Sequence, residues 1–117
     1  MSDKELLHKI ETAFETAQRN SKREMILVGT ALTRILSNQT ADEQVAEMTK
    51  YYNGTGFTGS DGKIGTSMAK FFLRRGFLTP RQVAYWMRPA KNGKPKILKY
   101  RRQLLEFAKE KAARQVA

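Results

Sequence analysis

The sequence predicts an all-α protein, a compact bundle of about five or six helices with a helix-turn-helix-like hairpin in its second half. Apolar residues recur every three or four positions through most of the chain. Ser/Thr-x-x-Glu/Gln boxes stand before several of these runs, and clusters rich in Gly, Asn and Pro separate them. With 117 residues, the chain has the length of one domain with one modest core.

The first half carries three capping boxes, in which a hydroxyl caps a helix and an acid reaches back to the cap. The boxes are Ser2–Glu5, Ser21–Glu24 and Thr40–Glu43. The helices that follow them are predicted at Asp3–Arg19, Lys22–Leu36 and Ala41–Tyr52. Asn20 and Ser21 either interrupt the first helix or bend a longer one. Gly29 lies in an apolar stripe, where it would let a neighbouring element approach closely.

Residues 53–62 contain four glycines and predict a loop. The letters of Gly54, Gly56 and Gly59 match a dinucleotide fingerprint, but the preceding segment is helical and no βαβ unit follows, which argues against nucleotide binding. A helix over Lys63–Arg75 should begin at Ser60 or Asp61 as N-cap.

Gly76 stands where a left-handed helix end belongs, so it should terminate that helix. Thr79, Pro80 and Gln82 then form the next start signal, which predicts a short helix over Pro80–Met87. Its inward residues would be Val83, Trp86 and Met87. The two helices and their tight turn resemble a DNA-binding hairpin, with the second helix as the candidate for the groove.

Residues 88–96 carry two prolines, an Asn-Gly pair and lysines with no acid nearby in the sequence, which predicts a flexible basic loop. A last helix is predicted over Lys96–Arg114. Its first turns hold Lys99, Arg101 and Arg102, and cations at a helix N-terminus oppose the helix dipole. A bound anion would account for them.

Positive charge is concentrated in the second half of the chain. Residues 1–60 hold seven Lys/Arg and eight Asp/Glu, a net charge of −1, whereas residues 61–117 hold fifteen and three, a net charge of +12. We therefore treat 1–117 as one domain with a near-neutral helical half, 1–52, and a basic nucleic-acid-binding half, 53–117. Such asymmetry indicates a polyanionic partner. The alternative is a charged, solubilising surface.

The nucleic-acid interpretation favours DNA over RNA and assigns each candidate residue a role. The cations would neutralise phosphates, Tyr85 would stack on a base of a single strand, and Arg81 with Gln82 would read base edges in a duplex. The candidate binding residues are Lys70, Arg74, Arg75, Arg81, Gln82, Tyr85, Arg88, Lys91, Lys94, Lys96, Lys99, Arg101 and Arg102.

Little in the sequence indicates catalysis, so we expect a non-enzymatic protein without cofactor or metal. There is no cysteine, His8 is the only histidine, and the basic half holds three carboxylates, of which Asp61 is assigned as a helix cap. No apolar run approaches the roughly 18 residues of a membrane span, and residues 1–11 do not read as a signal peptide. A cytoplasmic location is expected.

Several spaced residues carry a resemblance to a small helical module of phage and bacterial proteins. They are Gly56-Phe57, Asp61, Gly65-x-Ser67-x-Ala69, Leu78-Thr79-x-x-Gln82 and Lys99-Tyr100-x-x-Gln103-Leu104. The module occurs as stand-alone phage proteins and as an appendage of Swi/Snf-like helicases. Here Thr58 stands for its usual Asn and Met68 for its usual Leu. The resemblance implies a phage or mobile-element setting close to DNA metabolism, in the host cytoplasm, and it implies no catalytic role.

A second functional hypothesis is a phage-encoded protein that binds and inhibits, or redirects, a host protein such as a nucleic-acid enzyme or a defence complex. The basic half would then dock on an acidic face or on a nucleic-acid site. The predicted helices within residues 3–52 would supply the surface for that partner or for a homodimer.

Overall fold

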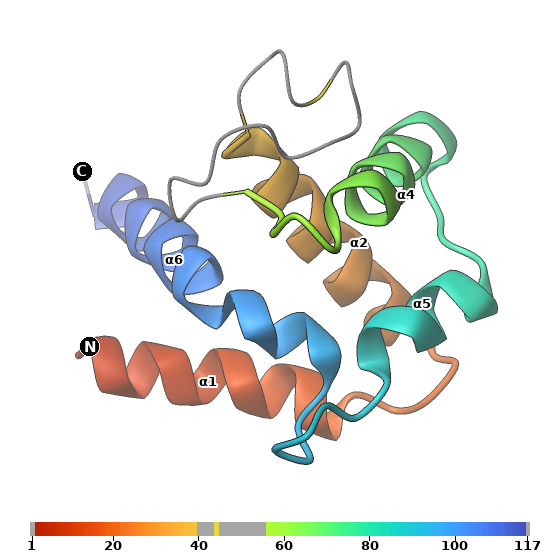
Figure 1. Ribbon diagram of the computed structural model, residues 1–117. Coiled ribbons are helices and arrows are strands. Elements are labelled where there is room, and N and C mark those ends of the chain that lie inside the picture. The colour runs from red at the N-terminus through yellow and green to blue at the C-terminus, as the bar shows by residue number, and fades with distance from the viewer. Residues whose placement is uncertain (1, 40–43, 45–55, 117) are drawn as a thin grey trace.

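The computed structural model describes residues 2–39, 44 and 56–116. Within these residues the chain forms five α-helices and one 3₁₀ helix, which confirms the all-α prediction (Figure 1). They are α1 (Asp3–Thr16), α2 (Lys22–Ser37), α4 (Gly62–Arg75), α5 (Pro80–Met87), η1 (Lys96–Tyr100) and α6 (Arg101–Val116). The predicted helix over Ala41–Tyr52 and the Thr40–Glu43 box lie, apart from Gln44, outside the described residues.

The helix starts of the first half follow the capping boxes. The Glu5 N–H donates to Ser2 Oγ over 3.2 Å, and the Glu5 carboxylate accepts from the Ser2 N–H, which completes that box. At α2, the Glu24 N–H donates to Ser21 Oγ over 3.1 Å. The Glu24 carboxylate, however, accepts from the N–H of Asn20 and not from that of Ser21.

The first helix is shorter than predicted, since α1 ends at Thr16 and not at Arg19. Ala17 is already extended, and Asn20 adopts a left-handed φ of 63°, which Asn tolerates better than most residues. Asn20 and Ser21 therefore interrupt the helix, and α1 and α2 point in different directions.

Helix α2 occupies the centre of the fold. It contacts α4, α5, η1 and α6, while α1 lies alongside α6 (Figure 1). Val28, Leu32 and Ile35 of α2 are fully buried because neighbours cover them from several sides. Gly29 faces the Phe72 ring of α4, and an added Cβ would collide with it, so the predicted close approach is confirmed.

The two helices predicted for the second-half hairpin are present with the turn between them, but α4 and α5 do not pack closely against each other as the helices of a helix-turn-helix do. Gly76 ends α4 with a φ of 78°, and its N–H donates to the Phe72 carbonyl. Thr79 and Gln82 form a complete capping box at the start of α5. Val83, Trp86 and Met87 are buried, as the sequence predicts. Both helices of the hairpin contact α2.

The last predicted helix is divided in two. Residues Lys96–Tyr100 form the 3₁₀ helix η1, and α6 begins at Arg101, so the prediction of one α-helix from Lys96 is wrong. Pro95 fixes the entry to η1, and the Leu98 N–H donates to its carbonyl. Three of the five residues of η1 are buried, namely Ile97, Leu98 and Tyr100. A 3₁₀ helix completes a turn about every three residues, so its winding differs from the α-helix that the sequence predicts.

An aromatic cluster lies where the loop before α4 meets α5 and η1. The Phe57 ring centroid is 5.9 Å from that of Trp86 and 5.7 Å from that of Tyr100, and Phe57 and Trp86 are fully buried. Gly65 of α4 makes room for Phe57, since a Cβ on Gly65 would lie 2.5 Å from the Phe57 ring.

We predict that Gly65→Val lowers the free energy of unfolding by about 2–3 kcal/mol, because Phe57 has no free space to move into. Urea unfolding followed by circular dichroism measures the change. The matched control is Gly59→Val, since no atom lies within 4 Å of a Cβ at Gly59 and a small effect is expected. Equal stability of the two variants would contradict the packing assigned to Gly65.

Candidate nucleic-acid interface

Four of the candidate cations line one groove of about 390 Å³ beside η1. We call it the basic groove, and its lining residues are Ala90, Lys91, Asn92, Pro95, Lys96, Leu98, Lys99 and Arg101. No carboxylate belongs to this lining in the part of the chain that the structure describes. The basic groove is therefore an anion-attracting surface.

The loop that forms one wall of the basic groove is held by its own backbone. The Ala90 N–H donates to the Lys94 carbonyl over 2.8 Å, and the Lys96 N–H donates to the Arg88 carbonyl over 2.9 Å. Gly93 turns the chain with a φ of 79°. The predicted flexible loop is thus a hydrogen-bonded turn, which places its lysines in a defined arrangement.

Two of the loop lysines have acidic partners that come from distant parts of the sequence. Lys94 forms a salt bridge with Glu11 of α1. Lys96 Nζ lies 3.3 Å from Asp61 Oδ1. The sequence indicated that these lysines have no acidic neighbour. That prediction was wrong for Lys94 and Lys96, because folding brings Glu11 and Asp61 to them. Lys91 is exposed and forms no salt bridge with a described residue.

Asp61 is not the helix cap that the sequence suggests. It stands at the N-cap position of α4, but its side chain makes no capping hydrogen bond. Its buried carboxylate instead accepts a hydrogen bond from the Tyr100 hydroxyl, and Lys99 Nζ lies 3.1 Å from Oδ2. With Lys96 on the other oxygen, Asp61 has two cations and one hydroxyl around it, which explains how a carboxylate can be buried.

The environment of Asp61 shifts the pKa values of this cluster. Burial alone raises the pKa of Asp61, but the hydrogen bonds from Tyr100 and Lys99 and the charges of Lys99 and Lys96 outweigh it and lower that pKa. Burial and the hydrogen bond to Asp61 raise the pKa of Tyr100 above its ordinary value. At neutral pH the cluster thus holds an ionised carboxylate and a neutral phenol.

The sequence suggests that a bound anion accounts for the cations near the predicted helix start. For Lys99, that anion is part of the protein. The Lys99 ammonium group donates to Thr58 Oγ1 and Asp61 Oδ2, so the protein itself supplies the anion for this residue. Arg101 is half-buried and Arg102 is exposed, both in the first turn of α6. These two arginines form no salt bridge with the described residues.

Tyr85 is half-buried beside the basic groove and already has cationic neighbours. Lys96 Nζ lies 3.3 Å from its hydroxyl and 4.6 Å from its ring centroid. The Arg88 guanidinium lies 5.3 Å from the same centroid, and the Trp86 ring meets it edge-on. Burial lowers the pKa of Lys96, but Tyr85 and Asp61 outweigh this effect and raise it, so Lys96 stays charged. A base stacking on Tyr85 would compete with these cations.

Gln82 and Arg81, the two residues expected to contact base edges of a duplex, differ in how many of their side-chain groups are already bonded within the protein. Gln82 Oε1 accepts from the Thr79 N–H over 2.8 Å, which leaves its amide N–H groups outside the capping box. Arg81 is exposed at the start of α5 and makes no salt bridge to a described residue. Arg81 is thus the freer of the two side chains.

The basic residues of α4 do not extend the basic groove into one face. Arg74 and Arg75 are exposed at the end of α4, about 20 Å along the helix from Asp61, which contacts the groove lysines. Lys70 donates to the backbone carbonyl of Gln44, so its charge is directed elsewhere. The candidate cations therefore do not form one surface: four of them line the basic groove, and Arg74 and Arg75 lie at the far end of α4.

The sequence analysis assigned no positioning role to two glutamines of this region, although Gln103 belongs to the residues that carry the family resemblance. Gln103 of α6 accepts from the Gly56 N–H and donates to the Gly56 carbonyl, both over 2.9 Å. Gln39 accepts from the Phe57 N–H and donates to Thr66 Oγ1. The i,i+3 spacing of Tyr100 and Gln103 was the available signal, since it aims both side chains at the same loop.

Comparison of the chain with protein-family models, with curated proteins and with solved structures found no match. None of the described helices is both long enough and apolar enough to cross a membrane.

We predict that Asp61→Asn destabilises the fold by about 2 kcal/mol at pH 7, because it leaves Lys96 and Lys99 without their shared anion; the figure is reduced because both lysines are partly exposed to solvent. The lowered pKa of Asp61 adds a pH dependence. Its stabilisation is present above the unfolded carboxyl pKa of about 4 and is lost as the pH falls through the lower folded value.

Urea unfolding of the wild type and of Asp61→Asn between pH 7 and pH 2 tests both points. The gap between the two proteins should narrow in acid. Hydrogen bonding to Lys94 and its charge lower the pKa of Glu11 as well, so the variant should keep part of the acid sensitivity. Glu106→Gln, which changes an exposed carboxylate, is the control. A gap that stays constant with pH would contradict the role of Asp61.

Proposed function

We propose that this chain is a small, non-enzymatic protein that binds nucleic acid, DNA in preference to RNA, through the phosphate backbone at the basic groove. The observation that carries the proposal is the convergence of Lys91, Lys96, Lys99 and Arg101 on one groove without a lining carboxylate among the described residues. Such a groove follows a polyanion better than it fits a neutral ligand.

The Asp61 salt bridges leave the lysines of the groove able to bind phosphate. Lys96 and Lys99 share one carboxylate, so this pairing retains one net positive charge. An ammonium group has three donors, and a phosphate can accept from those that do not point to Asp61. Lys91 and Arg101 add charges that no acid in a described salt bridge offsets. Asp61 would thus hold the lysines in place for a phosphate.

We expect the protein to bind nucleic acids of different sequence with similar affinity. Cations surround Tyr85, and the side-chain oxygen of Gln82 caps α5, so neither residue is fully available to a base. Phosphate contacts position a protein on nucleic acid but carry no sequence information. Arg81 is the residue that we expect to supply any base contact.

We predict that Lys91→Ala/Arg101→Ala weakens binding about ten-fold or more and makes the salt dependence less steep, by up to about 0.9 per lost phosphate contact on a duplex. Fluorescence anisotropy against matched single-stranded DNA, duplex DNA and single-stranded RNA at several salt concentrations measures both quantities. Stability should fall by no more than about 1 kcal/mol, because neither side chain belongs to a described salt bridge and Arg101 loses only one long hydrogen bond, to the Leu98 carbonyl over 3.5 Å.

The matched control is Lys4→Ala/Lys111→Ala. It removes the same two positive charges from exposed positions near the start of α1 and in the last turns of α6. The control should bind close to the wild type. If both double variants lose the same affinity, overall charge and not the basic groove drives binding. Absence of binding to all three nucleic acids at low salt would overturn the proposal.

A second candidate function, binding to a protein partner, has its own supporting observation. An apolar groove of about 250 Å³ lies between α1, α2 and α6. It is lined mainly by apolar residues, and Ile26 beside it is 43% exposed. If nucleic acid does not bind, a pull-down with the wild type and with Ile26→Asp tests this alternative. Inhibition or redirection of a host protein, and the phage or mobile-element setting, stay predictions.

A further inference from the structure

Glu24 is a buried carboxylate with an incomplete set of partners. The residue is 3% exposed. One of its oxygens, Oε1, accepts from the Asn20 N–H over 3.0 Å. The other, Oε2, is buried and accepts no hydrogen bond from the part of the chain that the structure describes. Because a buried carboxylate oxygen normally accepts a hydrogen bond, this atom is a candidate contact for a donor that the described residues do not supply.

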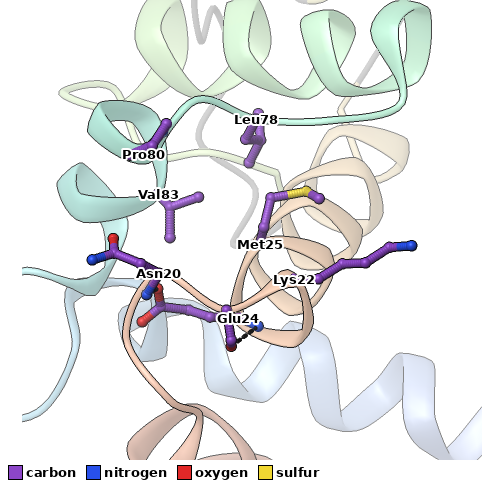
Figure 2. Close-up of a pocket in the computed structure, with 8 residues that line it drawn as sticks. Asn20, Lys22, Glu24, Met25, Leu78, Pro80 and Val83 are labelled. Atoms are coloured by element: carbon purple, nitrogen blue, oxygen red, sulfur yellow. Dashed lines mark hydrogen bonds between the residues drawn. The ribbon is translucent and has the colours of Figure 1, made fainter.

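Two cavities include Glu24 in their lining. The first, of about 200 Å³, lies between the start of α2 and α5 and is drawn in Figure 2. Its lining residues are Asn20, Ser21, Lys22, Glu24, Met25, Leu78, Pro80 and Val83. The second, of about 260 Å³, is lined by Phe14, Glu15, Ala17, Arg19, Glu24, Met87, Pro89, Gly93 and Pro95.

The first cavity combines apolar walls with a single acid. Met25, Leu78 and Val83 face one another across it, while the carboxylate of Glu24 lies at its lower end, near Asn20 (Figure 2). Lys22 extends away from Glu24 on the opposite side. Lys22 and Pro80 are exposed, so the cavity reaches the surface. Glu24 belongs to the cavity lining, and Oε2 is the oxygen of its carboxylate that accepts no hydrogen bond from a described residue.

The residues of this site favour some classes of ligand over others. A divalent metal needs several oxygen ligands, and Glu24 is the one acid among the described residues of the lining. A guanidinium prefers to engage both carboxylate oxygens, but Oε1 already accepts from Asn20. An ammonium group can bind through one oxygen, and an alkyl chain suits walls of Met, Leu and Val.

We propose that the cavity between α2 and α5 binds a small aliphatic primary ammonium compound. The ammonium group donates to Glu24 Oε2, and the alkyl chain lies against Met25, Leu78 and Val83. This site is separate from the basic groove and does not depend on nucleic-acid binding. Its ligand has the opposite charge to the polyanion that the groove would take.

The test is a titration of the ¹⁵N-labelled protein with n-butylammonium at pH 7 and low ionic strength, followed by amide chemical shifts. Butan-1-ol, which has the same chain and no charge, is the matched ligand. We expect saturable shifts at Asn20, Leu78 and Val83, with butylammonium binding at least about ten-fold more tightly than the alcohol. This comparison uses the wild-type protein, so it does not depend on the folding of a variant.

Two variants change the site in opposite directions. Glu24→Gln keeps the shape of the side chain but removes its charge, and it should weaken butylammonium binding about ten-fold without affecting butan-1-ol. Lys22→Ala removes a like charge from the exposed rim and should strengthen butylammonium binding. Equal affinity for amine and alcohol, or unchanged amine affinity in Glu24→Gln, would overturn the proposal.

The same titration shows which of the two cavities binds the amine. It also distinguishes a free amine from the lysine side chain of a partner protein. Shifts at Gly93 without shifts at Leu78 and Val83 would place the amine in the second cavity and overturn the assignment. N-acetyl-lysine methylamide presents the same group as a protein side chain. Tighter binding of this compound would assign the site to a lysine of a partner, and tighter binding of butylammonium would assign it to a free amine.

Discussion

The buried carboxylate of Asp61 joins two segments that are far apart in the sequence. It stands at the start of α4, and its partners Tyr100, Lys96 and Lys99 all belong to η1. A buried carboxylate that lost these donors would be costly, so α4 and η1 must meet in one arrangement. That arrangement sets the direction of two lysines of the basic groove. The positions of Lys96 and Lys99 in the basic groove therefore depend on their buried partner, Asp61.

Amide side chains extend the same connection. Gln103 pairs with both backbone groups of Gly56, and Gln39 holds the next residue, Phe57. These bonds fix the segment before α4 between α2 and α6 without any strand pairing to it. Phe57 then fills the space left by Gly65 and contacts Trp86. Polar bonds orient the segment, and Phe57 packs its ring against those of Trp86 and Tyr100.

This arrangement gives a physical role to several residues of the module that the sequence resembles, and membership of that module stays a prediction. Gly56 and Phe57, Asp61, Gly65, Tyr100 and Gln103 all contribute to the junction between α4, η1 and α6. They lie beneath the surface or bond to the backbone. Of the four groove cations, Lys99 belongs to the motif, whereas Lys91, Lys96 and Arg101 do not. A motif of this kind describes how the region folds. Partner choice would then depend on the residues around it.

The sequence by itself determined the helical class, the caps at Ser2, Ser21 and Thr79 and the helix end at Gly76, because these depend on neighbours within a few residues. It also determined the inward face of α5. Local signals could not reveal that Asp61 binds η1, that Glu11 pairs with Lys94, or that Lys96–Tyr100 winds as a 3₁₀ helix.

The meeting of four cations at one groove and the oxygen of Glu24 that lacks a partner among the described residues were likewise decided by tertiary structure. The reason is the same in each case. Charge pairing and burial depend on distances in space between residues that are tens of positions apart, and no local pattern in a single sequence records those distances.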